Sequence, residues 1–102
     1  MTNFLVFSIK PNRTVSTKPL NNKASALSSL QRDNEALECF NKVIEIDPDN
    51  FFAWSKKASI LFSLDKMDKA LEYCNKALEI NTTEPLAWIT KITVLINLAT
   101  LV

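Results

Sequence analysis

The chain has 102 residues and a formal net charge of +1, and it contains neither histidine nor glycine. This length fits one domain, and the near-neutral charge gives no general attraction to nucleic acid or to an anionic membrane. The composition also excludes histidine-based catalysis, histidine metal sites and a glycine-rich phosphate-binding loop.

The first segment, residues 1–16, is expected to be an N-terminal tail or the remnant of a preceding helix. It contains an apolar run, FLVFSI over residues 4–9, that is too short for a signal-peptide core and has no basic residue before it. The first 32 residues hold five basic and no acidic residues, but no nucleic-acid-reading motif accompanies them. We therefore expect no nucleic-acid partner.

From there on, the sequence repeats itself at a spacing of 34 residues. The segment ALECFNKVIEIDPDN (36–50) returns as ALEYCNKALEINTTE (70–84), and NKASALSSL returns as KKASILFSL. A third start appears where FFAWSKKASILFSL (51–64) aligns with PLAWITKITVLINL (85–98). A fixed period of this length is typical of stacked structural units that pack on one another.

Each unit is predicted to contain two helices. Within 51–64, apolar side chains recur at steps of three and four residues, which places them on one helical face, and a similar pattern runs over 67–80. Asp49 or Asn50 is expected to cap the helix that starts at the second unit. Thr83 is expected to cap the last helix, with Pro85 in its first turn.

Few residues could carry chemistry. Asp65 and Asp68 form a carboxylate pair, but helix capping explains it, with Asp65 as the cap and Asp68 in the first turn. Cys39 and Cys74 are expected to be buried, reduced thiols that serve core packing, which indicates a cytoplasmic protein. We find no convergent catalytic set, so we expect no enzyme, no catalytic residue, no metal site and no cofactor.

The whole pattern resembles the tetratricopeptide repeat (TPR), a 34-residue helix–turn–helix unit. The resemblance rests on the recurring tryptophans Trp54 and Trp88 and on small residues where helices approach closely, such as Ala24, Ala58 and Ala70. It implies an all-α fold in which antiparallel helix–turn–helix repeats stack as a short right-handed α-solenoid. The implied divisions are a tail (1–16), repeat 1 (17–50), repeat 2 (51–84) and the first helix of a truncated third repeat (85–102).

The resemblance also implies a function. In this family the first helices line a concave groove that binds a peptide or a helix, so the chain is expected to be a protein–protein interaction scaffold. Carried over residue by residue, the predicted groove consists of Asn21, Asn22, Ser25, Phe52, Ser55, Lys56, Ser59, Phe62 and Thr90. Some members of this family bind chaperone tails through a carboxylate clamp, which needs particular basic and amide residues. The positions of that clamp hold other residues in this chain: Asn21, Ser25, Lys56, Leu86 and Thr90. We therefore expect no binding of such tails.

The last predicted helix is apolar on both broad faces, although an end unit usually carries a polar outer face. Three explanations stay open. The chain could be a non-functional fragment of a longer repeat protein, or the helix could form a homodimer through Leu86, Ile89, Thr93 and Ile96. The third, insertion into a membrane, is disfavoured because only 11 residues follow Lys91, fewer than a bilayer span needs.

Overall fold

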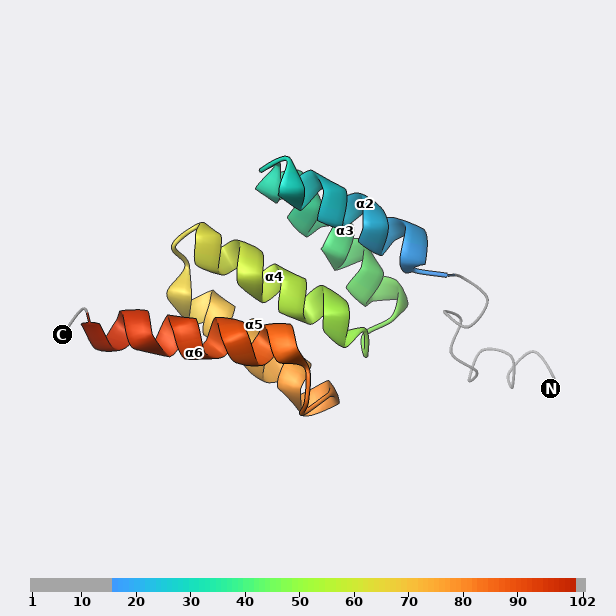
Figure 1. Cartoon of the computed structure of the whole chain (residues 1–102). Helices are drawn as coiled ribbons and strands as arrows, with labels where there is room; N and C mark the ends of the chain where they lie inside the picture. Colours follow the sequence, from blue (N-terminus) through green and yellow to red (C-terminus); the bar gives the residue numbers. More distant parts are fainter. Residues whose placement is uncertain (1–15, 101–102) are drawn as a thin grey trace.

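The computed structural model describes residues 16–100, and the regular elements of this part are all helices (Figure 1). The expectations for residues 1–15, a tail or the remnant of a helix, lie outside the described residues. The helices are α2 (Lys18–Ser29), α3 (Asp33–Ile46), α4 (Phe51–Ser63), α5 (Met67–Ile80) and α6 (Pro85–Thr100). The predicted all-α fold is confirmed.

Helix α4 lies in the middle of the stack. It packs against α3 of the preceding helix pair, against its own partner α5, and against α6. Figure 1 shows the α2/α3 pair on one side of α4 and the α5/α6 pair on the other. Because both sides of α4 are covered, more of its side chains are buried than in α2 or α6.

The turns inside the two repeats are built alike without glycine. In each, one residue adopts a left-handed backbone conformation, Gln31 with φ 61° and Asp65 with φ 67°. The N–H of the next residue reaches back to a helix carbonyl, Arg32 to Leu27 at 2.8 Å and Lys66 to Leu61 at 2.8 Å. This pattern of bonds is the Schellman motif, which satisfies carbonyl groups at a helix C-terminus.

The turn geometry corrects the prediction that Asp65 caps α5. Asp65 belongs to the end of α4, and the residue at the N-cap of α5 is Lys66, whose side chain makes no capping hydrogen bond. Asp68 does lie in the first turn of α5, as predicted. The reason is that the Schellman motif places its left-handed residue directly after the C-cap of α4, and this residue is Asp65. The N-cap of α5 is the residue after it, Lys66.

The two helix starts between repeats show one correct and one wrong prediction. Asn50 caps α4, because its side-chain oxygen accepts a hydrogen bond from the Ala53 N–H at 3.0 Å. Thr83 does not cap α6: its N–H and hydroxyl donate to the side-chain oxygen of Asn81. The capping contact is made by Glu84, whose Oε1 accepts from the Leu86 N–H at 2.9 Å.

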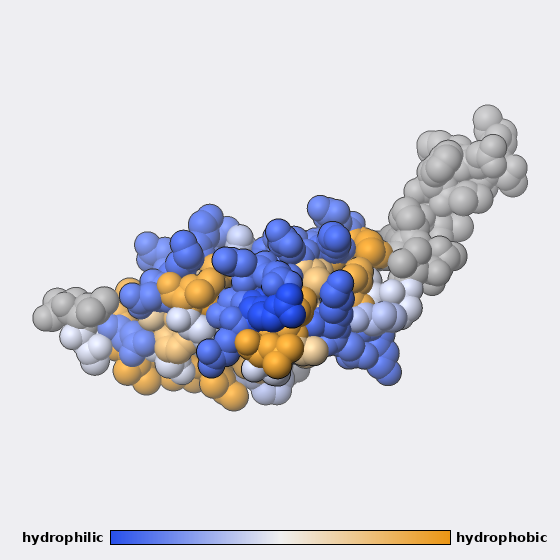
Figure 2. All heavy atoms as spheres, turned by 90° about the horizontal axis from the view of Figure 1, so that it is seen from above, coloured by the Kyte–Doolittle hydropathy of each residue, from blue (hydrophilic) through white to orange (hydrophobic). Residues whose placement is uncertain are grey.

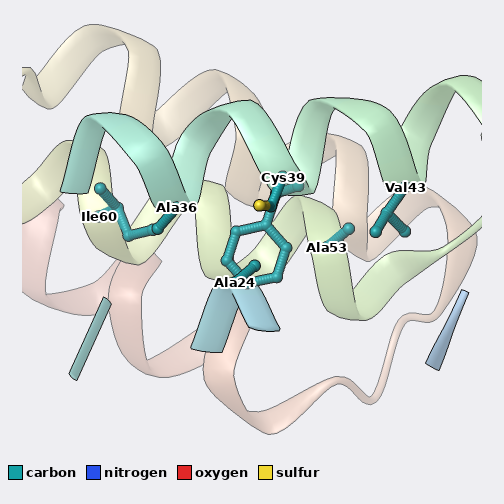
Figure 3. Packing of buried hydrophobic residues seen from close by; sticks show 7 residues of the cluster. Ala24, Ala36, Cys39, Val43, Ala53 and Ile60 are labelled. Atoms are coloured by element: carbon teal, nitrogen blue, oxygen red, sulfur yellow. The ribbon is translucent and has the colours of Figure 1, made fainter. Parts of the chain in front are cut away.

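The core runs along the helix interfaces as small and medium apolar side chains. Figure 3 shows Ala36, Cys39 and Val43 of α3 directed toward residues of α2 and α4. The alanines expected where helices approach closely are fully buried: Ala24, Ala36, Ala58 and Ala70. Both cysteines are free and buried, as the sequence predicted.

Candidate functional site

The first helices α2, α4 and α6 carry every residue of the predicted groove. On α4, Phe52, Lys56 and Ser59 are spaced by four and three residues, which places them on one helical face. Asn22 and Ser25 stand three residues apart on α2, which contacts α4. The structure therefore presents these five residues on two neighbouring helices.

Phe52 has a defined orientation although it is partly open to solvent. Phe52 is 39% exposed. Its ring meets the buried Phe40 ring edge-on, with the two ring centroids 6.3 Å apart. Lys56 Nζ lies 5.9 Å from the centroid of the Phe52 ring. An edge-to-face aromatic pair and a cation over the ring both hold the Phe52 ring in place.

The polar residues of the predicted groove differ in exposure. Asn22 is exposed, whereas Ser25 and Ser59 are half-buried. Asn21 is half-buried as well, and its Oδ1 atom is buried without a hydrogen-bond partner among the described residues. The exposed amide of Asn22 and the two hydroxyls can therefore bond a ligand backbone at the surface, while Asn21 is turned inward in part.

Two residues of the predicted groove are removed from the surface. Ser55 is fully buried and Thr90 is 6% exposed, so neither can touch a ligand in this conformation. For Ser55 the reason is the central place of α4, whose neighbours cover it on both sides. The Ser55 hydroxyl has no hydrogen-bond partner within residues 16–100.

Phe62 is better described as part of the core than as a free anchor. It is half-buried and packs against the cluster formed by Leu61, Ala70 and Val94. Its replacement by alanine would remove core contacts as well as groove surface. Because large-to-small changes in a core cost stability, a variant at Phe62 would not test the predicted groove alone.

Helix α6 displays a broad apolar surface, as its sequence predicted. Ile89 is 62% exposed and Ile96 is 56% exposed, whereas Leu86 and Thr93 are half-buried. Further exposed apolar residues of α6 are Trp88, Ile92 and Leu95. Figure 2 shows hydrophobic surface gathered along the edge of the molecule near its C-terminal end.

A cluster of lysines and aromatic rings on α4 and α5 was not anticipated from the sequence. Lys57 Nζ lies 4.3 Å from the ring centroid of Tyr73 and 5.3 Å from that of Trp54. Burial lowers the pKa of Lys57; the nearby Glu72 opposes this shift and Lys69 adds to it. The available signal was the spacing of Trp54 and Lys57, which recurs in Trp88 and Lys91, where Nζ lies 5.6 Å from the Trp88 ring.

The remaining chemistry of the described residues is sparse. Burial raises the pKa of the Cys74 thiol to about 11, so this thiol stays protonated at neutral pH and is a poor nucleophile. No group of three or more potential metal ligands occurs within residues 16–100. In the same part of the chain, no helix has both the length and the apolar character needed to cross a bilayer.

Two comparisons with known proteins bear on this arrangement. The family model for the tetratricopeptide repeat matches residues 18–50 and 51–83. The second TPR of Spaghetti (RPAP3), solved bound to the HSP90 peptide SRMEEVD, has a TM-score of 0.82 at 17% identity, over 91% of this chain and 87% of that chain. No curated protein matches the sequence significantly.

Two further solved structures are similar to the chain. The first TPR of Spaghetti (RPAP3), also bound to SRMEEVD, has a TM-score of 0.79 at 26% identity, over 83% of this chain and 69% of that one. YrrB, described as a TPR protein with an unusual peptide-binding site, has a TM-score of 0.77 at 24% identity, over 82% of this chain and 43% of that one. The likeness therefore extends across both repeats and into α6.

Proposed function

The chain belongs to the tetratricopeptide repeat family, and we propose on this basis that it is a non-enzymatic scaffold that binds a peptide or helix along α2 and α4. Domains of this family generally mediate protein–protein interactions. The observation that carries the proposal is the exposed, edge-packed ring of Phe52 with Lys56 beside it. The contacts proposed are Phe52, Lys56, Asn22, Ser25 and Ser59.

Phe52 has the properties of an apolar anchor. Its ring is already held by Phe40, so little side-chain entropy is lost when a ligand packs on its open part. Partly exposed aromatic residues held in this way contribute much of the binding free energy at many interfaces. Lys56 adds a positive charge next to the apolar contact, which favours a ligand with an acidic side chain beside an apolar one.

The polar residues would fix the ligand backbone. An extended peptide carries an unpaired N–H or C=O at every residue, and side-chain amides and hydroxyls in a groove can satisfy them. Asn22 offers both a donor and an acceptor from α2, and Ser25 and Ser59 offer hydroxyls from α2 and α4. Ser55 and Thr90 are left out of this proposal because they are buried.

The ligand proposed here differs from the HSP90 peptide SRMEEVD that the two Spaghetti domains bind. A clamp for a terminal carboxylate would need basic residues at the positions that Leu86 and Thr90 occupy. Leucine and threonine cannot pair with a carboxylate charge, and Thr90 is also buried. We therefore propose that SRMEEVD shows no saturable binding to this chain, and micromolar affinity for it would contradict this part of the proposal.

The experiment that tests the main proposal is selection of peptides from a random display library, followed by affinity measurement on a selected peptide. Phe52→Ala should weaken binding at least about tenfold, as expected for an anchor residue. Leu30→Ala is the matched control, because Leu30 is 66% exposed and lies in the turn after α2. Equal affinity of the Phe52→Ala and wild-type chains would contradict the groove proposal, provided both show the same helical circular dichroism.

A second candidate function is self-association through α6. It is favoured by the exposure of Ile89, Ile92 and Ile96, which are all more than half accessible. Contiguous apolar surface of this kind usually marks an interaction site. A further repeat helix from a longer protein is the alternative occupant of this surface.

Light scattering coupled to size-exclusion chromatography distinguishes these occupants. Self-association predicts a dimer or larger species whose mass rises with protein concentration and returns to that of a monomer in Ile96→Lys. Leu30→Lys, which places the same charge at an exposed apolar residue outside α6, should leave the assembly intact. A monomer at all concentrations would contradict self-association.

A further inference from the structure

A cavity between α3, α4 and α5 is lined by three lysines. It has a volume of about 310 Å³ and is formed by residues of these three helices and by Lys66 at the N-cap of α5. Its polar lining consists of Lys57, Lys66 and Lys69 with the Asn41 amide and Tyr73. No carboxylate belongs to the lining that the described residues provide, so the cavity carries a concentrated positive charge.

The charge in the cavity is only weakly neutralised by its surroundings. Glu72 pairs with Lys69 at 3.8 Å, but both side chains are more than half exposed, where such pairs contribute little. Lys57 has no carboxylate within ion-pair distance among the described residues, and its ammonium group rests against the Tyr73 ring instead. Burial lowers the pKa of Lys57; the charge of Glu72 opposes this only in part, and the charge of Lys69 lowers the pKa further.

The remaining walls are apolar. Leu37 of α3 and Leu61 of α4 line the cavity together with Tyr73 of α5. Apolar walls with a few convergent polar groups are typical of small-ligand sites, and a volume of roughly 300 Å³ lies at the lower end of their usual range. The walls would therefore accept an organic group next to the charge that the lysines attract.

We propose that this cavity binds an organic phosphate monoester, with the phosphate at Lys57, Lys66 and Lys69 and the organic part against Leu37, Leu61 and Tyr73. A phosphate dianion offers several acceptor oxygens, and three ammonium groups with an amide supply matching donors. The site is distinct from the proposed peptide groove, whose residues do not line it. It is independent of the proposed scaffold function.

Phenyl phosphate is the probe for this site, because it joins a dianionic phosphate to a small apolar ring. Titrated into the full chain and followed by nuclear magnetic resonance, it should produce saturable shifts of the Tyr73 ring signals with one-to-one stoichiometry. Inorganic phosphate should bind at the same place but more weakly, because it leaves the apolar wall unoccupied. Equal affinities would overturn the organic part of the proposal, and the absence of saturable shifts would overturn all of it.

A matched pair of variants separates this site from general attraction to lysines. Lys57→Met keeps the apolar stem over Tyr73 and Trp54 but removes the charge, and it should weaken phenyl phosphate binding at least about tenfold. Lys91→Met removes the equivalent lysine of the next unit, which packs on Trp88 and does not line the cavity, and should change affinity less than about twofold. Similar losses in both variants would contradict the proposed site.

The exposed lysines provide a second measurement in case Lys57→Met alters the packing of Trp54. Lys66→Gln and Lys69→Gln together remove two charges at solvent-facing positions, where substitutions rarely disturb folding. The double variant should also lose at least about tenfold in affinity. Unchanged affinity in a folded double variant would contradict the proposed placement of the phosphate.

Discussion

Trp54 donates a hydrogen bond from its indole N–H to the backbone carbonyl of Pro48 at 2.9 Å. The contact recurs 34 residues later, where Trp88 donates to the carbonyl of Thr82 at 2.6 Å. Each tryptophan thus fastens the first helix of a unit to the loop that enters it. In the first unit the same position is Leu20, which has no side-chain donor.

The first prediction concerns this indole bond. Trp54→Phe keeps an aromatic ring but removes the donor and some of the packing on Ala77, Leu78 and Ala87. The free energy of unfolding should therefore fall by at least about 1 kcal/mol, a typical net value for one hydrogen bond. Trp88→Phe should act similarly, since the Trp88 bond joins the equivalent positions of the next unit. Urea unfolding followed by circular dichroism measures both variants. An unchanged free energy of unfolding in both would contradict the role of the bond.

The second prediction concerns the left-handed turn residues. Gln31→Gly should raise the free energy of unfolding by up to about 1 kcal/mol, because glycine adopts positive φ without the steric conflict of a β-carbon. Asp65→Gly should gain less, since aspartate tolerates this conformation better than glutamine does. Thermal unfolding of the two variants tests the order. A larger gain for Asp65→Gly would show that strain at the β-carbon is not the deciding factor.

The third prediction concerns the buried hydroxyl of Ser55. Ser55→Ala removes a polar group that has no hydrogen-bond partner in the described structure, so it should raise the free energy of unfolding by about 1 kcal/mol. Ser59→Ala, on the same helix but half-buried, should change it by less than about 0.5 kcal/mol. Destabilisation by Ser55→Ala would mean that the hydroxyl has a partner after all, such as a bound water.

The fourth prediction concerns the Cys74 thiol. Its pKa is raised by burial from 9.0 to about 11, because the thiolate is disfavoured in the apolar interior. A raised pKa contributes stability that is fully present below pH 9.0 and is lost as the pH rises toward about 11, since the unfolded chain ionises first. The stability difference between the wild-type chain and Cys74→Ala should therefore shrink over this range.

The comparison with Cys74→Ala is needed because Lys57 acts in the opposite direction. Its pKa is lowered, so the folded state disfavours the charged amine, and this penalty is relieved as the pH rises toward 10.5. Lys57 is present in both chains, so its contribution cancels in the difference. Urea unfolding at a series of pH values measures it, and a difference that stays constant up to pH 11 would contradict the raised thiol pKa.

Much of the fold could be predicted from the sequence because its determinants are local or periodic. The spacing of apolar residues gave the two helices of each repeat, and small residues such as Ala24 and Ala58 marked the close helix contacts. The sequence limited the cap of α4 to Asp49 or Asn50, because a capping side chain bonds a backbone group only a few residues away, and the structure shows that it is Asn50. The caps predicted at Asp65 and Thr83 were wrong because each residue has another local role. Asp65 takes the left-handed position at the end of α4, and Thr83 bonds Asn81 while Glu84 makes the capping contact.

The candidate sites depended on the tertiary structure. The sequence alone specified the repeat period, the helices and the family. It also specified the two helices that carry the proposed groove. Only packing decided that Ser55 is buried while Phe52 is partly open, and that Lys57, Lys66 and Lys69 line one cavity. The physical reason is that helical periodicity specifies which side of one helix a residue occupies, whereas exposure depends on what other helices place against that side.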